Sequence, residues 1–551
     1  MTDNLRIILW AALAAMLFFN YQAWQQQYAQ PGLASEPAAV GSPAEPATDD
    51  LPAFPEMDVE ATDGDLPTIA GGTVDSTGPV ITVETDVLSI EIGSRGGDIR
   101  RALLKGYPQE KSRPDVPVEL LNPKPASLFV FRTGLRAAGG RDEATHKSIY
   151  TSARTAYSLA DGDDVLEVPL RWESPEGITI EKTYRFRRGR YDILLDFSAR
   201  NDSETPYSVA NYLQLQRVHL PLERSMFNVD SYSFTGPVVY DGDKYEKLDV
   251  DDLEDGPFNL VVNGGWIASI QHHFLAAAVP EGTEQETYQV TYDGKQYLMT
   301  AIGPVTTIEP GMEGVFTSKL FIGPKLQQQL NEVSDGLALT VDYGVLAILA
   351  QPLFWLLGQV HNFVGNWGWS IIIVTFLIKL VFYPLTEKSG RSMAKMRNLQ
   401  PRLKALQDRH KDDRQAMSQA LMDLYKREKV NPVAGCLPML IQIPFFIAFY
   451  WVLLESVEMR QAPFMLWITD LSIRDPYFVL PLLMGAAMFG QQKLNPAPPD
   501  PVQAKVMTFL PVMFTVFFAF FPAGLVLYWL TNSVLSILQQ WRINRVVSGA
   551  H

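Results

Sequence analysis

The chain has 551 residues, a length that allows several domains, and its 46 basic and 61 acidic residues give a formal net charge of -15. This acidic balance argues against specific nucleic-acid binding by most of the chain. The one cysteine, Cys436, excludes intrachain disulfides and the usual thiolate zinc sites, and we interpret it as a packing residue.

The N-terminal region combines one apolar stretch with a long polar segment. The stretch Leu5–Phe19 has aromatic residues near its borders, such as Trp24, and no small-residue cleavage site follows it. This pattern favours an uncleaved transmembrane anchor at residues 1–24, with a cleaved signal peptide as the alternative. Residues 25–78 are rich in Pro, Ala, Asp, Glu and Gly, which predicts a disordered periplasmic linker.

Residues 79–335 show the period-two pattern of half-buried strands. Apolar residues occupy alternate positions in four runs: 88–92, 178–186, 191–197 and 288–292. The second and third runs are joined by a short connection at Gly189, and the fourth is followed by the turn pair Asp293-Gly294, so both places predict hairpins. Because helical stretches are few, the region is predicted to be a large antiparallel β-sandwich.

The predicted sandwich has no recognisable catalytic centre. Its scattered histidines, His146, His219, His272 and His273, have neither metal-site nor triad spacing, so we interpret them as core or surface residues. We expect no metal site, no catalytic residue and no enzymatic activity. A carbohydrate-binding or epimerising role stays open, because loops at a sandwich edge can hold a ligand without leaving a motif.

The C-terminal part has the composition of a membrane domain. Apolar runs occur at 345–360, 367–385, 433–454, 477–490, 506–521 and 525–538. Between the second and third runs, residues 385–430 carry twelve Lys and Arg but only six acids. The positive-inside rule places this loop in the cytoplasm, and the acidic sandwich therefore lies on the other side of the bilayer.

The first of these runs is predicted to lie on the outer membrane surface. If it crossed the bilayer, the basic loop would face the wrong compartment; Pro352 also interrupts it. Residues 343–364 are thus assigned to an interfacial amphipathic helix, and the other five runs to a core at 365–541 with a short cytoplasmic tail at 542–551. The fold class is a polytopic α-helical membrane protein, with an N-terminal anchor helix, a five-helix core and a large periplasmic β-sandwich.

The basic loop has helical spacing on both sides of the polar segment 410–413. Met393 and Met396 belong to one apolar stripe and Met417 to another, so two antiparallel helices are predicted over 386–430. Two interpretations stay open. The hairpin either only links two spans, or presents flexible methionines that capture varied apolar segments.

Polar residues occur deep inside the predicted spans. Lys379 lies within the second run, with Thr375 one helical turn before it. A lysine near a helix centre costs about 2.5 to 3.5 kcal/mol on insertion scales, so it should face protein or water; snorkelling of its long stem is the alternative. Gln442 and Asn532 could line a wet cavity with it. Hydroxyls such as that of Ser536 carry less weight, because they often bond their own helix.

Several short motifs stand out between Tyr343 and Trp541. They are the stretches 366–385, 392–397, 399–401, 429–432, 435–436, 460–464 and 524–529. These stretches closely resemble the YidC membrane-protein insertases, and the anchor, linker and sandwich match the Gram-negative form of the YidC/Oxa/Alb family in layout. The resemblance implies an inner-membrane protein whose five-helix core encloses a hydrophilic groove that is open to cytosol and lipid but closed outside.

By position, the resemblance also implies roles for individual residues. Lys379 falls where the family usually has arginine, so the charge is kept but the bidentate fork is lost. The residues expected to line or flank the groove with it are Thr375, Gln442, Tyr528, Trp529 and Asn532. The implied partners are nascent membrane proteins, the lipid bilayer, and the Sec translocon with its accessory subunits. Because the tail after Trp541 is short, the resemblance supports a ribosome contact less strongly than it supports these partners.

The expected function is the movement of nascent transmembrane segments from the cytosol into the inner membrane. A segment would touch the methionine-bearing hairpin, its polar flank would enter the groove near Lys379, and its apolar part would partition into lipid. The sequence has no phosphate-binding loop, and no cofactor is expected. Two other classes stay open: a secondary transporter or channel with Lys379 as counter-charge, and a membrane-anchored periplasmic carbohydrate-binding protein.

Overall fold

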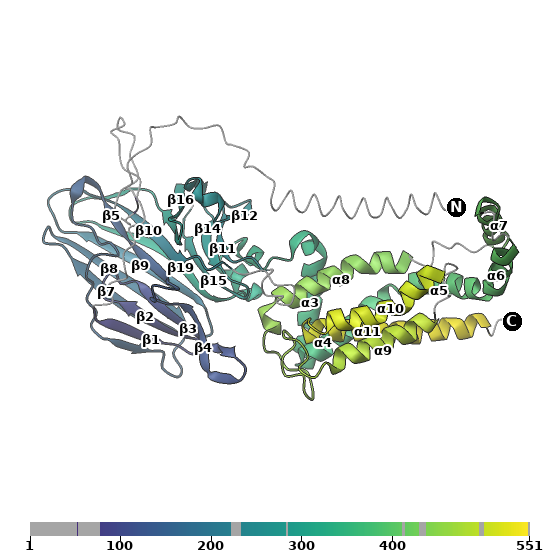
Figure 1. Cartoon of the computed structure of the whole chain (residues 1–551). Helices are drawn as coiled ribbons and strands as arrows, with labels where there is room; N and C mark the ends of the chain where they lie inside the picture. The colour runs from purple at the N-terminus through teal and green to yellow at the C-terminus, as the bar shows by residue number, and fades with distance from the viewer. Residues whose placement is uncertain are drawn as a thin grey trace. The chain divides into compact units, whose positions relative to one another are not determined.

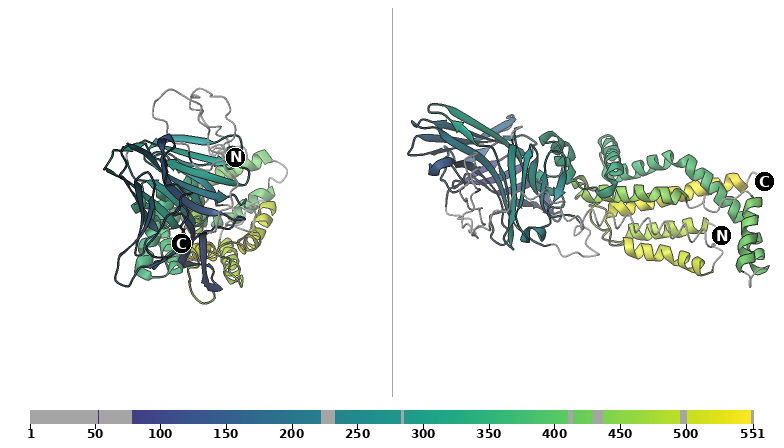
Figure 2. Two further views of the ribbon diagram at one scale, coloured as in Figure 1. Left: turned by 90° about the vertical axis from the view of Figure 1, so that its left-hand side faces the viewer. Right: turned by 90° about the horizontal axis from the view of Figure 1, so that it is seen from above.

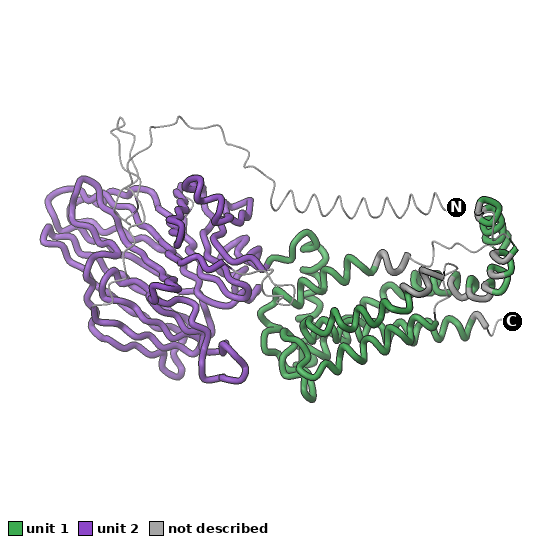
Figure 3. Tube along the Cα trace, in the orientation of Figure 1, with its two compact units in different colours: residues 1–41, 342–551 green, residues 42–341 purple. Residues whose placement is uncertain are grey.

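The computed structural model describes residues 52, 78–221, 233–282, 285–409, 414–428, 437–494 and 501–548. They form two compact units that meet in the sequence between Val341 and Asp342 (Figure 3). One unit is built mainly of strands and the other of helices (Figure 1). The predicted anchor, almost all of the predicted linker and Cys436 lie outside the described residues.

The strand unit contains an 11-stranded sheet and an 8-stranded sheet. The larger sheet consists of β1 (Val80–Glu84), β2 (Leu88–Gly93), β3 (Ile99–Glu110), β4 (Arg113–Leu121), β5 (Phe129–Ala137), β6 (Ala156–Ser158), β10 (Tyr207–Val218), β13 (Phe258–Asn263), β16 (Gln285–Tyr292), β17 (Gln296–Ile302) and β18 (Thr306–Ile308). The smaller consists of β7 (Val165–Glu173), β8 (Ile178–Arg187), β9 (Asp192–Asn201), β11 (Gly236–Tyr240), β12 (Tyr245–Lys247), β14 (Trp266–Ile270), β15 (Phe274–Pro280) and β19 (Glu313–Pro324).

The topology is antiparallel almost throughout. The larger sheet has the order β13-β16-β17-β10-β5-β3-β2-β1-β6, with β18 paired to β10 and β4 paired to β3; the smaller has the order β12-β11-β14-β15-β19-β9-β8-β7. Among the described strands, only β1 and β6 pair in parallel. The helix α2 (Gln327–Val333) and the 3-10 turn η4 (Leu337–Thr340) extend this unit to Val341, beyond the limit of 335 used in the sequence analysis.

The alternation in the sequence becomes alternation in burial. Every second residue of β8 from Ile178 to Phe186 is buried. β8 pairs with β9 across a turn at Gly189, whose φ of +69° lies in the left-handed region that favours glycine. β16 and β17 pair across the Asp293-Gly294 turn. Both predicted hairpins, and the predicted antiparallel β-sandwich, are therefore confirmed.

A buried polar cluster ties the two sheets together. Lys182 of β8 stands in the apolar row of its strand and is fully buried. Its Nζ donates to the carbonyl oxygens of Gly96, at 2.8 Å, and Thr133, at 3.3 Å, and lies 3.9 Å from Oδ1 of Asp98. Burial lowers the pKa of Lys182 to about 8, although the Asp98 carboxylate acts in the opposite direction. In the sandwich core, the ammonium of Lys182 thus donates hydrogen bonds to backbone carbonyl groups of the other sheet and its connections.

The helical unit contains nine α-helices among its described residues. They are α3 (Ala347–Val364), α4 (Trp367–Val381), α5 (Tyr383–Asn398), α6 (Gln400–Arg409), α7 (Arg414–Arg427), α8 (Leu437–Glu455), α9 (Val479–Leu494), α10 (Pro501–Phe518) and α11 (Ala523–Ser548), with the 3-10 turns η5 (Gly344–Leu346) and η7 (Val457–Met459). α4, α8, α9, α10 and α11 form the bundle, in which α11 contacts α4, α8 and α9. α5 to α7 and the C-terminal end of α11 lie at one end of it (Figures 1 and 2).

The other end of the bundle is fixed by capping contacts. Oδ1 of Asn366 accepts from the backbone N–H of Trp369 at the start of α4, while its amide nitrogen donates to the carbonyl of Phe464. The buried carboxylate of Asp475 accepts from the backbone N–H of Leu480, at 2.7 Å, at the start of α9. Side-chain oxygens here satisfy N–H groups that a helix start leaves without partners.

In the described part of the chain, one helical stretch is long and apolar enough to cross a membrane by itself, at 344–364; α4 and α5 meet the same criterion only as a pair bent by 65°. The stretch at 344–364 includes α3, which Figure 1 shows lying across the end of the bundle. Its Ile348, Trp355 and Phe363 are 81%, 64% and 93% exposed. The interfacial location of this helix stays a prediction.

The cytoplasmic hairpin of the sequence analysis contains three helices rather than two. α5 follows α4 after a sharp bend, and Pro384 stands in its first turn. α5 then ends at Asn398, and α6 begins two residues later with Pro401 in its first turn. Proline suits the first turn of a helix, but inside a helix it has no N–H to donate and its ring clashes with the carbonyl group four residues earlier, so Pro384 and Pro401 account for both breaks.

Candidate functional site

A polar cluster joins three helices in the middle of the bundle. Nζ of Lys379, on α4, donates to Oδ1 of Asn532 at 2.9 Å and to Oγ of Ser536 at 2.8 Å, both on α11. Nε2 of Gln442, on α8, donates to the same Oδ1 at 2.9 Å. A lysine can only donate, so Asn532 must present its oxygen, and Gln442 must then present its nitrogen. One lysine therefore fixes the orientation of both amides.

The cluster offsets the cost of placing a charge among apolar helices. Hydrogen bonds to charged groups contribute about 1.5 to 3 kcal/mol each, which is comparable to the insertion cost of a lysine at a helix centre. Lys379, Asn532 and Gln442 are only partly buried. The ammonium of Lys379 is thus held against α11 instead of extending along α4.

An aromatic layer lies one helical turn from this cluster. The buried Tyr528 stacks on Phe446 and Phe449, with ring centroids 5.9 and 4.7 Å apart, and Trp529 meets Phe446 edge to face at 4.5 Å. Phe446 follows Gln442 by four residues on α8, and Tyr528 precedes Asn532 by four on α11. We call the end of the bundle that carries α5 to α7 the basic end. The layer lies on the side of the cluster away from this end, and it closes the space between α8 and α11 there.

Thr375 and Ser536 have different roles in the structure from those that the sequence analysis gave them. The hydroxyl of Thr375 is buried and donates to the carbonyl oxygen of Ile371 at 2.6 Å, so its donor is used within α4. Ser536 received little weight, yet its Oγ accepts from Lys379 while donating to the carbonyl oxygen of Asn532 at 2.7 Å. Its position four residues after Asn532, on the same helical face, is the signal that could have identified it.

The methionines of the hairpin have unequal surroundings. Met396 is partly buried against an apolar cluster of α6 and α7 that includes Leu403 and Leu421. Met417 is partly buried on α7. The side chain of Met393 lies outside the described residues. At least one of the three methionines therefore contributes to contacts within the hairpin, and their capture role stays a prediction.

The histidines of the strand unit contact other ring side chains. Nδ1 of His146 lies 2.7 Å from the hydroxyl of Tyr212, and His272 stacks on His273 with ring centroids 3.7 Å apart. Over the residues that the structure describes, no group of three or more His, Cys, Asp or Glu could hold a metal ion.

Comparison with known proteins identifies the family. The model of the 60Kd inner membrane protein family matches residues 359–550, and that of the YidC periplasmic domain matches residues 80–356. The chain is 48% identical to the membrane protein insertase YidC of Thioalkalivibrio sulfidiphilus, covering 100% of this chain and 99% of the relative. It is 47% identical to the YidC of Nitrosococcus oceani, with 99% of each chain covered.

A solved structure described as an active YidC insertase with its first transmembrane domain resolved is 18% identical, covering 85% of this chain and 93% of that one, at a TM-score of 0.38. That score is too low to add to the assignment, which rests on the sequence identities and the two family models. By these matches over its whole length, the chain belongs to the YidC family of membrane protein insertases.

Proposed function

We propose that this protein inserts nascent transmembrane segments into the inner membrane through a hydrated groove lined by Lys379, Gln442 and Asn532. The observation that carries the proposal is the cluster of these residues, in which a partly buried ammonium is held between three helices of an otherwise apolar bundle. A charge at that place is costly unless water or a polar partner reaches it.

The cluster would lower the barrier to moving a polar flank across the membrane. Two of the three N–H groups of the Lys379 ammonium are directed to α11, which leaves one for water or for a substrate carboxylate. Exchanging water for such partners reduces the desolvation penalty of the flank. The aromatic layer of Tyr528 and Phe449 would stop water at its outer side, so that the groove opens only toward the basic end and toward lipid.

The driving force would come from lipid and membrane potential. Transfer of an apolar segment from water contributes about 25 cal/mol per Å² of buried apolar surface. The potential adds about 2.3 kcal/mol per 100 mV for each acidic residue that moves outward. Since neither term needs a nucleotide or a covalent step, insertion would proceed as transfer down a free-energy gradient.

The orientation follows from charge. We place the end that carries α5 to α7 and the C-terminal end of α11 in the cytoplasm, because its loop is strongly basic. The chain's N-terminus would also be cytoplasmic, and the strand unit periplasmic. The hairpin would make first contact with substrate, and the Sec translocon and ribosome are partners to be tested by crosslinking from Met396 and Met417.

Insertion of a small single-span substrate into liposomes containing the full chain tests the proposal. Lys379→Arg should keep most activity, because it keeps the charge. Lys379→Met should slow insertion about 5- to 150-fold, as expected for a loss of roughly 1 to 3 kcal/mol, and Lys379→Glu should be worse for a substrate with an acidic flank. Lys388→Met, at an exposed position on α5, is the charge-matched control. Equal insertion rates for all three Lys379 variants and the unmodified protein would refute the proposal.

A further inference from the structure

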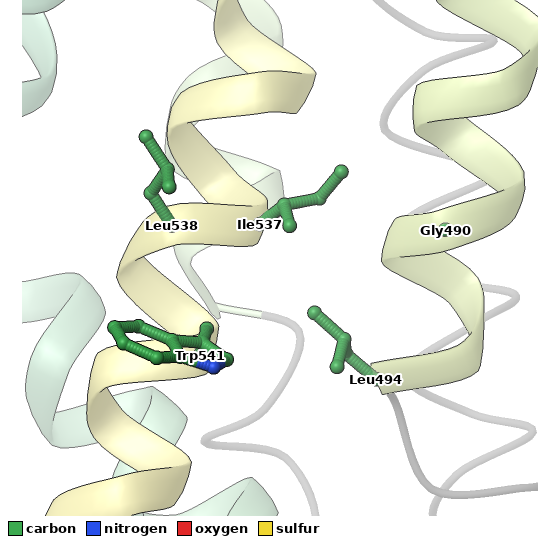
Figure 4. Close-up of a pocket in the computed structure, with 5 residues that line it drawn as sticks. All are labelled: Gly490, Leu494, Ile537, Leu538 and Trp541. Carbon is green, nitrogen blue, oxygen red and sulfur yellow. The ribbon is translucent and has the colours of Figure 1, made fainter.

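A second feature of the helical unit is an apolar notch between α9 and α11. It has a volume of about 400 Å³ and is lined by Gly490, Leu494, Ile537, Leu538 and Trp541. Figure 4 shows Leu494 and Ile537 on the facing sides of the two helices, with Trp541 one turn further along α11. Gly490 adds no side chain to the notch, and a Cβ placed there would meet Cδ1 of Ile537 at 3.7 Å, an ordinary contact distance.

The notch faces outward from the bundle. Leu538 and Trp541 are 56% and 53% exposed. They stand on a different face of α11 from Asn532, and the notch begins at Ile537, directly after Ser536. In a family of membrane proteins, such an exposed apolar surface faces the hydrocarbon of the bilayer. The notch is therefore separate from the Lys379 cluster and open to lipid.

Two basic side chains lie next to residues that line the notch. The guanidinium of Arg545, one turn after Trp541, lies 4.8 Å from the centroid of the indole ring. Lys493 is adjacent to Leu494 and exposed, with its Nζ 4.8 Å from the ring centroid of Phe489. The sequence contains no Asp or Glu after Asp500. Arg545 and Lys493 thus form a cationic rim next to a floor that is lined by apolar side chains.

We propose that the notch binds one acyl chain of an anionic phospholipid, whose phosphate lies against Lys493 and Arg545. The apolar floor and the cationic rim match the two parts of such a lipid, and basic residues near the membrane surface attract anionic headgroups. A transmembrane helix fits less well. A helix of about 10 Å diameter would fill this volume with a single turn, whereas an acyl chain is thin enough to lie along it.

This inference does not depend on the proposed groove, because it needs only that the bundle lies in a bilayer. It does have a consequence for the groove. Arg545, Trp541 and Ile537 are on the same helix as Asn532 and Ser536, so a lipid bound in the notch would brace the helix that holds Lys379. The lipid would act as a positioning ligand of α11.

Fluorescence quenching by lipids with brominated acyl chains tests the proposal on the full chain in nanodiscs. The signal of Trp541 is obtained as the difference between the unmodified protein and Trp541→Phe, since the chain has 11 tryptophans. Brominated phosphatidylglycerol should reach half-quenching of Trp541 at a mole fraction at least about fivefold lower than brominated phosphatidylcholine. Fivefold corresponds to about 1 kcal/mol, the usual contribution of one Lys or Arg near a membrane surface.

Three variants make the outcome decisive. Lys493→Gln with Arg545→Gln should make the two lipids equivalent, while Lys426→Gln with Arg427→Gln, an exposed pair on α7, should leave the preference unchanged. Gly490→Leu, which fills the notch, should weaken quenching by both lipids. Equal quenching by both lipids in the unmodified protein, an unquenched Trp541 covered by protein, or full quenching in Gly490→Leu would each overturn the proposal.

Discussion

Replacing Asn532 by leucine removes the one oxygen that Lys379 and Gln442 share. Both hydrogen bonds are 2.9 Å long, and Lys379 keeps its bond to Ser536 at 2.8 Å. On scales for soluble proteins, a charge-assisted and a neutral bond would sum to roughly 2 to 4 kcal/mol. Interhelical hydrogen bonds in membrane bundles average only about 0.6 kcal/mol, with a maximum near 1.7 kcal/mol. We therefore expect Asn532→Leu to lower the free energy of unfolding by about 1 to 3 kcal/mol.

A double-mutant cycle isolates the bond between Lys379 and Asn532. Unfolding of Lys379→Met, Asn532→Leu and the double variant in mixed detergent micelles should give a coupling energy of about 0.6 to 1.7 kcal/mol. Thr531→Ala is the matched control, because the hydroxyl of Thr531 donates only within α11, to the carbonyl oxygen of Leu527. That control should show no coupling with Lys379→Met. A coupling of the main pair within about 0.5 kcal/mol of zero, the limit of additivity for independent sites, would contradict the cluster.

Two further predictions concern buried charges outside the cluster. Asp475→Ala should destabilise the bundle by about 2 to 4 kcal/mol in thermal unfolding, because the carboxylate, 1% exposed, caps α9 at Leu480 and also accepts from Nε1 of Trp467 at 3.0 Å; Asp202→Ala, at an exposed loop position, should cost less than about 0.5 kcal/mol. The second prediction uses the pKa of Lys182, which burial lowers from 10.5 to about 8. Because the unfolded chain binds this proton more tightly, stability should rise with pH between about 8 and 10.5. Hydrogen exchange of β8 in the full chain should show that rise in the unmodified protein, and Lys182→Met should lack it; parallel pH profiles would contradict the assignment.

The strand unit could be predicted from the sequence because its signals are local. Alternating apolar residues over 178–186 and a glycine at position 189 specify a strand, a face and a turn without reference to the rest of the chain. Lys182 is the exception, since it occupies an apolar-face position in this pattern. Its partners, the carbonyls of Gly96 and Thr133, come from the facing sheet and more than forty positions away in the sequence. No local pattern contains that pairing.

In the helical unit, the sequence predicted the helices of the basic loop but not the place where the first of them breaks. The apolar stripes of the basic loop predicted helices, and α6 and α7 pack through Leu403 and Leu421 as those stripes indicate. The division of the first helix at Leu399 was not predicted, although Pro401 marks it. Proline inside a helical pattern has two outcomes, a first turn or a kink, and packing of the neighbouring residues decides between them.

For the polar cluster, the sequence identified the residues but not their partners. Lys379, Gln442 and Asn532 stand out as polar groups in apolar runs, and helical spacing places Ser536 beside Asn532. Lys379 can bond both residues of α11 only at one axial position of α4 relative to α11. Close approaches near the other end of the bundle constrain these axial positions. A Cβ on Gly368 would lie 2.1 Å from a ring carbon of Phe464, and one on Gly524 would lie 3.2 Å from the carbonyl oxygen of Leu471.

Because these hydrogen bonds depend on the axial position of α11, this helix determines how the ammonium of Lys379 is held. A slip of α11 by one residue would move Asn532 by about 1.5 Å along the helix axis and turn it by about 100°, which breaks bonds of 2.8 and 2.9 Å. Contacts at Gly524 resist such a slip at one end of the helix. Toward the other end, the notch beside Trp541 is a local gap in the packing of α9 against α11, and an acyl chain bound there would fill it. The environment of Lys379 would then depend on the lipid composition of one leaflet as well as on the protein.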